Sequence, residues 1–195
     1  MSATLEQQVR QLQDQVRLLQ DRAEILDCVQ RYSRGLDRHD EEVLASAYHP
    51  DATEVHGHHF VGPIPEFVKW VNGLHESCWA AHQHFLSNHR VDIDGDVAHA
   101  ETYVLHVLRW RDKPAVDIGG SRYIDRLERR DGKWAIVLRQ VRVEWYAQAD
   151  ASAYPAVAEL YPSGTWDKSD LSYARPLLGP GATEDHRDGR PSVVR

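Results

Sequence analysis

Three segments in the second half of the chain, residues 97–110, 119–129 and 133–145, alternate polar residues with β-branched and aromatic ones. This two-residue period predicts three long β-strands. Short loops bound the strands, and Gly95 and Gly132 stand where a tight hairpin needs a positive φ angle. The pattern therefore predicts an antiparallel meander.

The predicted strands are long enough to curl, because long strands twist. A bent sheet with helices on its concave side encloses a mostly apolar cavity, which is the usual place for a small ligand. Gly119 and Gly120 begin the middle strand. We interpret this pair as a bulge or a close approach within the bent sheet, and not as a phosphate-binding loop.

The first 34 residues contain neither Pro nor Gly and predict a helix, whose end we expect Gly35 to loosen. Its apolar residues recur at alternating steps of four and three, which is a heptad seam. They are Leu5, Val9, Leu12, Val16, Leu19, Ala23 and Leu26. A seam this narrow fits a partner helix. Residues 1–21 therefore predict a helical extension, which either belongs to the chain's own structure or pairs with a neighbouring subunit.

Further elements are predicted between this helix and the meander. Asp40 is a candidate N-cap for a short helix over residues 41–50. Residues 51–62 predict a strand pair, residues 66–79 a third helix, and residues 82–92 the strand that enters the meander. The order is two helices, a strand pair, a helix and four long strands. This order predicts an α+β fold with helices on one face of the sheet.

Composition and pattern together favour one domain with appendages. The chain has 195 residues, 42% of them hydrophobic, which is enough for one core. The domain is expected over residues 22–146. Residues 147–178, with irregularly spaced aromatics and prolines, predict an ordered C-terminal extension. Residues 179–195 are polar and rich in Gly and Pro, and predict a disordered tail.

Charge and cysteine content exclude several classes of partner. The net charge is −7 without a basic stripe, so nucleic acid would be repelled. No run of about 18 apolar residues and no signal peptide pattern occur, so we expect no membrane association. Cys28 and Cys78 form no metal-binding or CxxC spacing, which is typical of free thiols in a reducing compartment. We expect a cytoplasmic protein.

Three stretches resemble the nuclear transport factor 2-like superfamily and, within it, the SnoaL-like branch. They are RYSRGLDRHDEEVLASAYHPDA at 31–52, HFLSNHRVDIDGDVAHAETY at 84–103 and GSRYIDRLERRDGKWAIVLRQVRVEW at 120–145. The resemblance implies a cone-shaped α+β barrel, in which a strongly curved antiparallel sheet wraps around helices and encloses one cavity. Members of the superfamily include dehydratases, dehydrochlorinases, isomerases, cyclases, epoxide hydrolases and non-catalytic modules.

The resemblance also implies a catalytic pair. In members similar to scytalone dehydratase, hexachlorocyclohexane dehydrochlorinase and bile-acid dehydratase, an aspartate on the first helix faces a histidine on the strand after the third helix. Asp37, in the GLDRHD motif, matches the aspartate. His84, with Asn88 four residues later, matches the histidine. His82 lies on the same strand face and is an alternative base.

Two further positions are catalytic candidates by the same resemblance. Tyr32 matches the tyrosine of the first helix, although it lies five residues before Asp37 instead of beside it. Arg139 matches an arginine on the last long strand, and it has a plain alternative as an ion-pair partner of Asp37 or Glu144. We expect the substrate to contact a mainly aromatic set of side chains. They are Tyr48, His82, Phe85, Tyr103, Trp110, Tyr123 and Trp145.

An aspartate that fixes one imidazole nitrogen leaves the other free to remove a proton. We therefore predict a cofactor-independent lyase of the dehydratase type, acting on a hydrophobic, ring-containing small molecule. C–C bond cleavage or double-bond isomerisation with the same dyad is an alternative. Another is a non-catalytic ligand-binding or assembly module, or the small subunit of a ring-hydroxylating dioxygenase. We expect a homo-oligomer, either a dimer or a trimer.

Histidine pairs raise the question of a metal. His56-x-His58 and His82-x-His84 could present four imidazoles to zinc, iron or copper. The sequence has neither a glutamate at cupin-like spacing nor an HExxH motif beside them. We therefore predict no metal ligands among these residues.

Overall fold

The computed structural model describes residues 4–179, which form a mixed α+β fold. The elements follow the predicted order of two helices, a strand pair, a helix and four long strands, with two short helices added at the end. They are α1 (Leu5–Arg38), α2 (Glu41–Ser46), β1 (Tyr48–His56), β2 (Phe60–Pro63), α3 (Ile64–Cys78), β3 (Trp79–Asp94), β4 (Val97–Trp110), β5 (Ala115–Arg130), β6 (Lys133–Asp150), α4 (Tyr154–Ala158) and the 3-10 helix η1 (Leu171–Tyr173).

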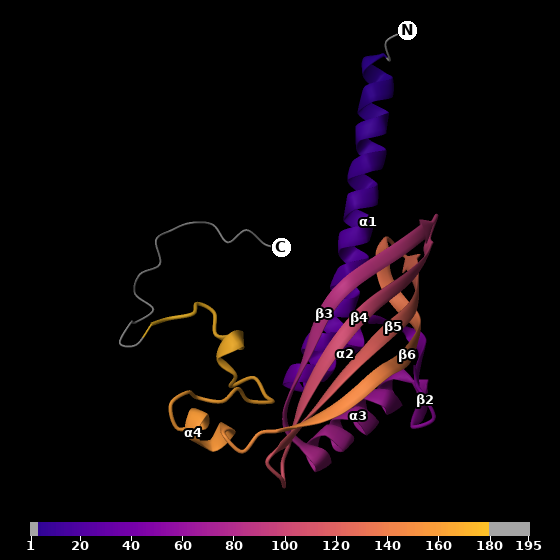
Figure 1. Ribbon diagram of the computed structural model, residues 1–195. Helices are drawn as coiled ribbons and strands as arrows, with labels where there is room; N and C mark the ends of the chain where they lie inside the picture. Colours follow the sequence, from indigo (N-terminus) through magenta and orange to yellow (C-terminus); the bar gives the residue numbers. More distant parts are fainter. Residues whose placement is uncertain (1–3, 180–195) are drawn as a thin grey trace.

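The strands of the described region make one curved sheet in the order β2-β1-β6-β5-β4-β3 (Figure 1). Neighbouring strands are antiparallel, except that β1 runs parallel to β6. The predicted α+β fold with a strongly curved sheet is confirmed. The sheet is open, however, because β2 and β3 form its two edges and do not pair with each other within residues 4–179.

The predicted hairpins form where glycine allows a positive φ angle. Gly95 has a φ of 58° between β3 and β4, and Gly132 has a φ of 78° between β5 and β6. The register of β5 against β6 shifts between Gly120 and Ser121, which confirms the bulge interpreted from the glycine pair. This shift changes which side chains face the interior.

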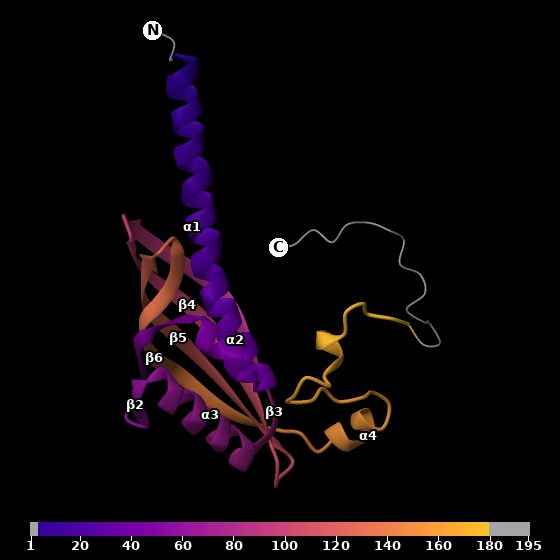
Figure 2. The same ribbon diagram turned by 180° about the vertical axis from the view of Figure 1, so that it is seen from behind.

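The helices α1, α2 and α3 lie on the concave side of the sheet (Figure 2). The second half of α1 buries Ile25, Val29 and Leu36 against this side. Gly35 does not loosen the helix, and that prediction was wrong. A Cβ atom at Gly35 would lie 2.5 Å from the backbone nitrogen of Leu44, so the glycine lets α2 pack directly on α1.

The first half of α1 projects beyond the sheet (Figures 1 and 2). Its seam is exposed, with Leu5 at 76%, Leu12 at 59% and Leu19 at 67% relative exposure. No helix of the region spanning residues 4–179 is both long enough and apolar enough to cross a membrane.

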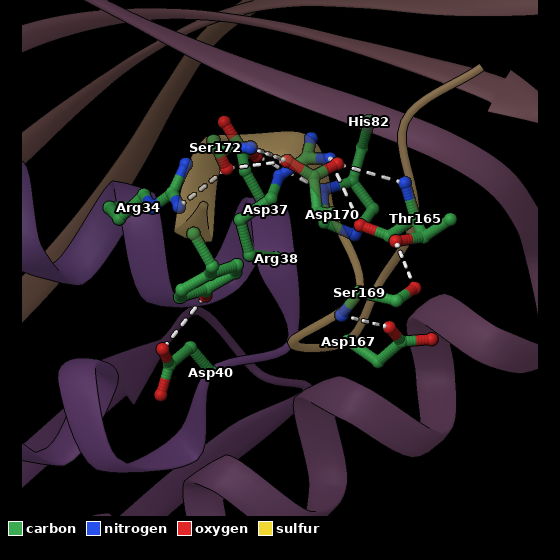
Figure 3. A network of polar contacts seen from close by, with 11 residues as sticks. Arg34, Asp37, Arg38, Asp40, His82, Thr165, Asp167, Ser169, Asp170 and Ser172 are labelled. Atoms are coloured by element: carbon green, nitrogen blue, oxygen red, sulfur yellow. Dashed lines mark hydrogen bonds and ion pairs between the residues drawn. The ribbon is translucent and has the colours of Figure 1, made fainter. Parts of the chain in front are cut away.

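The chain after the meander returns to the C-terminal end of α1 (Figure 3). Asp170 accepts a hydrogen bond from Arg38 at 3.1 Å, and the Tyr173 hydroxyl donates to Asp40 at 2.8 Å. We call the segment of residues 165–173 the C-terminal strap. Figure 3 shows it close to Asp37 and His82. Apart from Gly179, the tail predicted over residues 179–195 lies outside the described residues, as do residues 1–3 of the predicted N-terminal extension.

Candidate active site

Asp37, in the last turn of α1, holds two histidines of β3. Its Oδ1 lies 2.7 Å from Nδ1 of His84 and 3.1 Å from Nδ1 of His82, while Oδ2 accepts from the His84 backbone N–H at 2.9 Å. Both rings reach the same carboxylate because side chains two residues apart on a strand point to the same face. A carboxylate acceptor places the proton of each ring on Nδ1, which leaves each Nε2 with a free lone pair.

These contacts keep Asp37 ionised. Burial by itself would raise the pKa of the carboxyl group, but the hydrogen bonds from His82 and His84 outweigh it and hold the pKa well below its usual range. The dyad that the resemblance implied therefore meets the geometric condition for a general base.

A cavity of about 420 Å³ lies between the helices and the concave side of the sheet. Its walls are mostly apolar and aromatic, with several histidines: Tyr32, Leu36, His56, His59, Trp70, Val71, Leu74, His75, Trp79, His84, His106, Leu108, Asp117, Ser121, Tyr123, Val141, Val143 and Tyr146. His84 lines this cavity. His82 is only 2% exposed, and its Nε2 lies 3.3 Å from Nε2 of His39. Of the two candidate bases, His84 is the one whose ring borders the cavity.

Two of the predicted tyrosines also border the cavity. Tyr32 and Tyr123 are buried and pack edge to face with ring centroids 5.1 Å apart. The Tyr32 hydroxyl has no hydrogen-bond partner within the described chain. Burial raises the pKa of both phenols well above the usual value. Both hydroxyls therefore stay protonated and can donate a hydrogen bond to a bound molecule.

Arg139 lies behind these tyrosines and not on the cavity wall. Its guanidinium is fully buried and makes two hydrogen bonds, of 2.7 and 2.6 Å, to the carboxylate of Asp125. It stacks 4.0 Å from the ring centroid of Tyr32 and 4.2 Å from that of Tyr123. The alternative partners expected from the sequence, Asp37 and Glu144, were wrong, because the ion-pair partner is Asp125, which accepts from Nε and Nη2 of Arg139.

Several residues predicted to contact the substrate lie elsewhere. Phe85 follows His84 on β3 and therefore points to the opposite, convex face, where it is 49% exposed. Tyr103 and Trp145 are 43% and 51% exposed and border a shallow groove on the convex face. Trp110 lies at the end of β4, where the ammonium nitrogen of Lys113 is 3.8 Å from the centroid of its ring.

Tyr48 is buried next to the cavity without lining it, and its hydroxyl donates to Glu54 Oε2 at 2.7 Å. Of the tyrosines predicted for the site, Tyr32 and Tyr123 thus border the cavity.

The bulge in β6 explains the position of Trp145. Val141 and Val143 line the cavity, and unbroken alternation would place residue 145 there as well. The extra residue between Val143 and Trp145 reverses the alternation, so Tyr146 lines the cavity instead. Tyr146 was missed from the sequence, although the pair Gly119-Gly120 signalled the bulge opposite it.

Other residues missed from the sequence are histidines. His75 and His106 line the cavity, and His39 lies directly after α1. Burial, reinforced by neighbouring histidines, lowers the pKa of His39 and of His106 to about 4 and that of His75 well below its usual value. These imidazoles are neutral at pH 7. Helical spacing from Val71 for His75, and strand alternation for His106, could have indicated both positions.

The pair His56-x-His58 does not converge with His82-x-His84. His56 borders the cavity, whereas His58 is exposed in the turn between β1 and β2. The four-imidazole arrangement considered from the sequence is therefore not formed.

Comparisons with known proteins agree with this fold. The SnoaL-like domain family matches residues 17–140, which is more than half of the chain. No curated protein matches the sequence. Among solved structures, the hexachlorocyclohexane dehydrochlorinase LinA-type3 from Novosphingobium barchaimii is 25% identical, with a TM-score of 0.64 over 69% of this chain and 94% of that chain.

Two further structures are more distant in sequence. A scytalone dehydratase-like protein from Novosphingobium aromaticivorans is 22% identical, with a TM-score of 0.60 over 68% of this chain and 88% of that chain. A protein with a cystatin-like fold from Nostoc punctiforme is 21% identical, with a TM-score of 0.52 over 74% of this chain and 96% of that chain. These likenesses show a shared fold.

Proposed function

Because the chain belongs to the SnoaL-like domain family, we propose that it is a cofactor-independent lyase of the dehydratase type. The observation that carries the proposal is the 2.7 Å contact between Asp37 Oδ1 and His84 Nδ1, with the His84 ring on the wall of a mostly apolar cavity. Solved structures with this fold include a dehydrochlorinase and a scytalone dehydratase-like protein, and an elimination fits the same base.

In the proposed reaction, Nε2 of His84 removes a proton from a carbon next to a carbonyl group. The Asp37 carboxylate stabilises the imidazolium that forms, without taking the proton itself. A base placed in this way contributes about 10²- to 10⁴-fold to the rate. The C–O bond then breaks as the C=C bond forms, and the His84 proton leaves with the hydroxyl group as water.

The hydroxyls of Tyr32 and Tyr123 are the proposed donors to the substrate oxygen. Both border the cavity, and the Tyr32 hydroxyl has no partner among residues 4–179. A donor aimed at an oxygen that gains negative charge lowers the barrier, because it stabilises the transition state more than the bound substrate. Arg139 is proposed to act indirectly by holding both rings in place.

The cavity wall supports the proposed substrate class. Trp70, Leu74, Val141 and Tyr146 present apolar and aromatic surface. A volume of about 420 Å³ falls within the range of sites that enclose one small molecule. A hydrophobic molecule that carries a ring and a β-hydroxy carbonyl group would fill it.

Substitution of the dyad tests the proposal. Asp37→Asn and His84→Ala should each lower kcat/KM by about 10²- to 10⁴-fold on an active member of a panel of ring-containing β-hydroxy carbonyl compounds. Phe85→Ala is the matched control, since Phe85 neighbours His84 but points to the convex face. Its turnover should equal that of the wild type. Near-wild-type turnover in a folded His84→Ala protein would reject the role of His84.

Deuterium at the carbon that loses the proton separates this reaction from its alternatives. Elimination sends the deuteron to solvent and yields a product lighter by one water. Double-bond isomerisation keeps the substrate mass apart from exchange, and C–C cleavage releases two carbon-containing fragments. Mass spectrometry of the products identifies which of the three occurs.

A further inference from the structure

Three histidines from three different elements meet beside Asp37. His39 directly follows α1, His75 lies in the last turn of α3, and His82 lies on β3. Each offers a ring nitrogen, and these nitrogens all lie within 4.8 Å of one another. The His75 and His82 ring centroids are 4.2 Å apart. His75 also lines the cavity, where its ring centroid lies 6.5 Å from that of His84.

Two of these rings approach each other through their Nε2 atoms. His82 donates its Nδ1 proton to Asp37, so its Nε2 is an acceptor. On the other side of the His39 ring, Nδ1 lies 3.6 Å from Glu76 Oε1. The two Nε2 atoms are 3.3 Å apart. In the metal-free chain one Nε2 can donate a hydrogen bond to the other, and a bound cation would take the place of that proton.

The third ring, that of His75, has a buried nitrogen without a hydrogen-bond partner among the described residues. His75 is only 6% exposed, and its Nδ1 has no hydrogen-bond partner in the part of the chain that the structure describes. Buried polar atoms in native proteins are almost always paired. A metal ion shared with His39 and His82 would give this buried ring a polar partner.

The surroundings resemble those of histidine ligands in metal sites. Such histidines usually direct their second nitrogen to a carboxylate, which orients the ring. Asp37 does this for His82, and Glu76 is placed to do it for His39. The Trp166 ring covers the pair, with its centroid 4.1 Å from that of His39 and 4.8 Å from that of His82. An apolar cover of this kind limits access of water to a bound ion.

We propose that His39, His75 and His82 bind one divalent transition-metal ion, with Zn²⁺ the best fit. Imidazole ligands suit this class of ion, and two Zn–N bonds of about 2.0–2.1 Å at a tetrahedral angle separate their nitrogens by about 3.3 Å. The ion joins the end of α1 to α3 and β3, the elements that position Asp37 and His84. Its role is to fix these elements, so the site goes beyond the proposed elimination chemistry.

Zinc binding to the full-length chain tests this inference. After treatment with a chelator, the protein is titrated with Zn²⁺ in competition with a chromophoric chelator, and its melting temperature is followed. We expect one equivalent to bind and the melting temperature to rise. Co²⁺ should give the visible absorption of a tetrahedral site with nitrogen ligands. Failure of the wild-type chain to bind either ion tightly would overturn the proposal.

Matched variants locate the site. His39→Asn should weaken Zn²⁺ binding at least about 10-fold. Asparagine tolerates the positive φ of 49° at this position, so the metal-free variant should still fold, although it loses the stacking of the His39 ring on Trp166. His99→Asn, at an exposed position on β4, should bind Zn²⁺ like the wild type. Equal affinity in the His39 and His99 variants would contradict the assignment.

Zinc affinity and turnover, measured on the same variants, test the zinc site and the proposed function independently. His84→Ala should lose turnover but keep Zn²⁺ affinity, because His84 is outside the ligand set. Asp37→Asn should weaken Zn²⁺ binding by about 10- to 100-fold through the orientation of His82. An Asp37→Asn protein that binds zinc like the wild type would remove Asp37 from the site while leaving its role in the dyad open to the kinetic test.

Discussion

At the scale of single residues, Gly35 shows how one missing Cβ atom positions the site. Its absence lets the backbone of Leu44 pack on α1 two residues before Asp37. Gly35→Ala should destabilise the protein by about 1–2 kcal/mol, because overpacking outweighs the higher helix propensity of alanine. Gly73→Ala in α3, where a Cβ atom meets nothing within 4 Å, should instead stabilise it by about 0.5–1 kcal/mol. Urea unfolding measures both; equal effects would contradict the packing argument.

Protonation of His106, on the cavity wall, should make the free energy of unfolding depend on pH. Burial, with repulsion from His84 and His56 and opposed by Asp117, lowers its pKa to about 4 in the folded chain. The unfolded chain, with an ordinary histidine pKa of about 6.5, therefore binds more protons between the two values. The free energy of unfolding should fall as the pH drops through this window.

His106→Gln tests this coupling. The variant should lose less stability than the wild type when unfolding is measured from about pH 7 to about pH 4.5, because the proton that favours the unfolded chain is gone. His39, whose pKa is lowered in the same way, still contributes in both proteins. Parallel stability curves for the two proteins would show that His106 does not titrate as its burial implies.

Arg139 and Asp125 form a buried ion pair, and breaking it should cost far more than breaking an exposed one. Arg139→Met leaves the Asp125 carboxylate uncompensated and should lower the free energy of unfolding by about 3–5 kcal/mol. Arg122→Met removes ion pairs with Glu101 and Glu144, which are partly exposed, and should cost about 0–1 kcal/mol. An Arg139→Lys protein with wild-type stability and lost turnover would instead indicate direct contact with the substrate.

At the scale of elements, strand alternation carried most of what the sequence could predict. The four long strands and the position of His82 and His84 on one strand face follow from a period of two, and both hairpins follow from glycines that adopt a positive φ angle. The aromatic set expected to contact the substrate included Trp145, but the bulge turns Trp145 outward and places Tyr146 on the cavity wall. Gly119 and Gly120 indicated a bulge, but a sequence does not show which residue of the partner strand becomes the extra one.

Residues brought together by tertiary packing were the hardest to predict. His39 lies between two helices and follows neither a helical nor a strand period, so no local pattern linked it to His82. Its position depends on α1 continuing past Gly35 to Arg38. Asp125, as the partner of Arg139, likewise follows from the β5–β6 register and not from spacing along the chain.

At the scale of the whole molecule, α1 is one continuous helix that contains both the projecting seam and Asp37. Its free half and its buried half are therefore mechanically connected. The C-terminal strap is attached at the other end of the helix, through Asp170 to Arg38 and Tyr173 to Asp40. Contacts that order the projecting half would thus act on the same helix that positions the Asp37 carboxylate.

The projecting seam leads to a prediction about assembly. Val9 and Val16 alternate with leucines at positions 5, 12 and 19, and β-branched residues at a positions with leucine at d positions favour a parallel two-stranded coiled coil. We expect the chain to form a dimer through this seam in sedimentation equilibrium. Leu12→Glu should give a monomer. Leu18→Glu, on the same helix but off the seam and 49% exposed, should stay dimeric. A monomeric wild type, or equal behaviour of the two variants, would show that the seam does not join two copies of the chain.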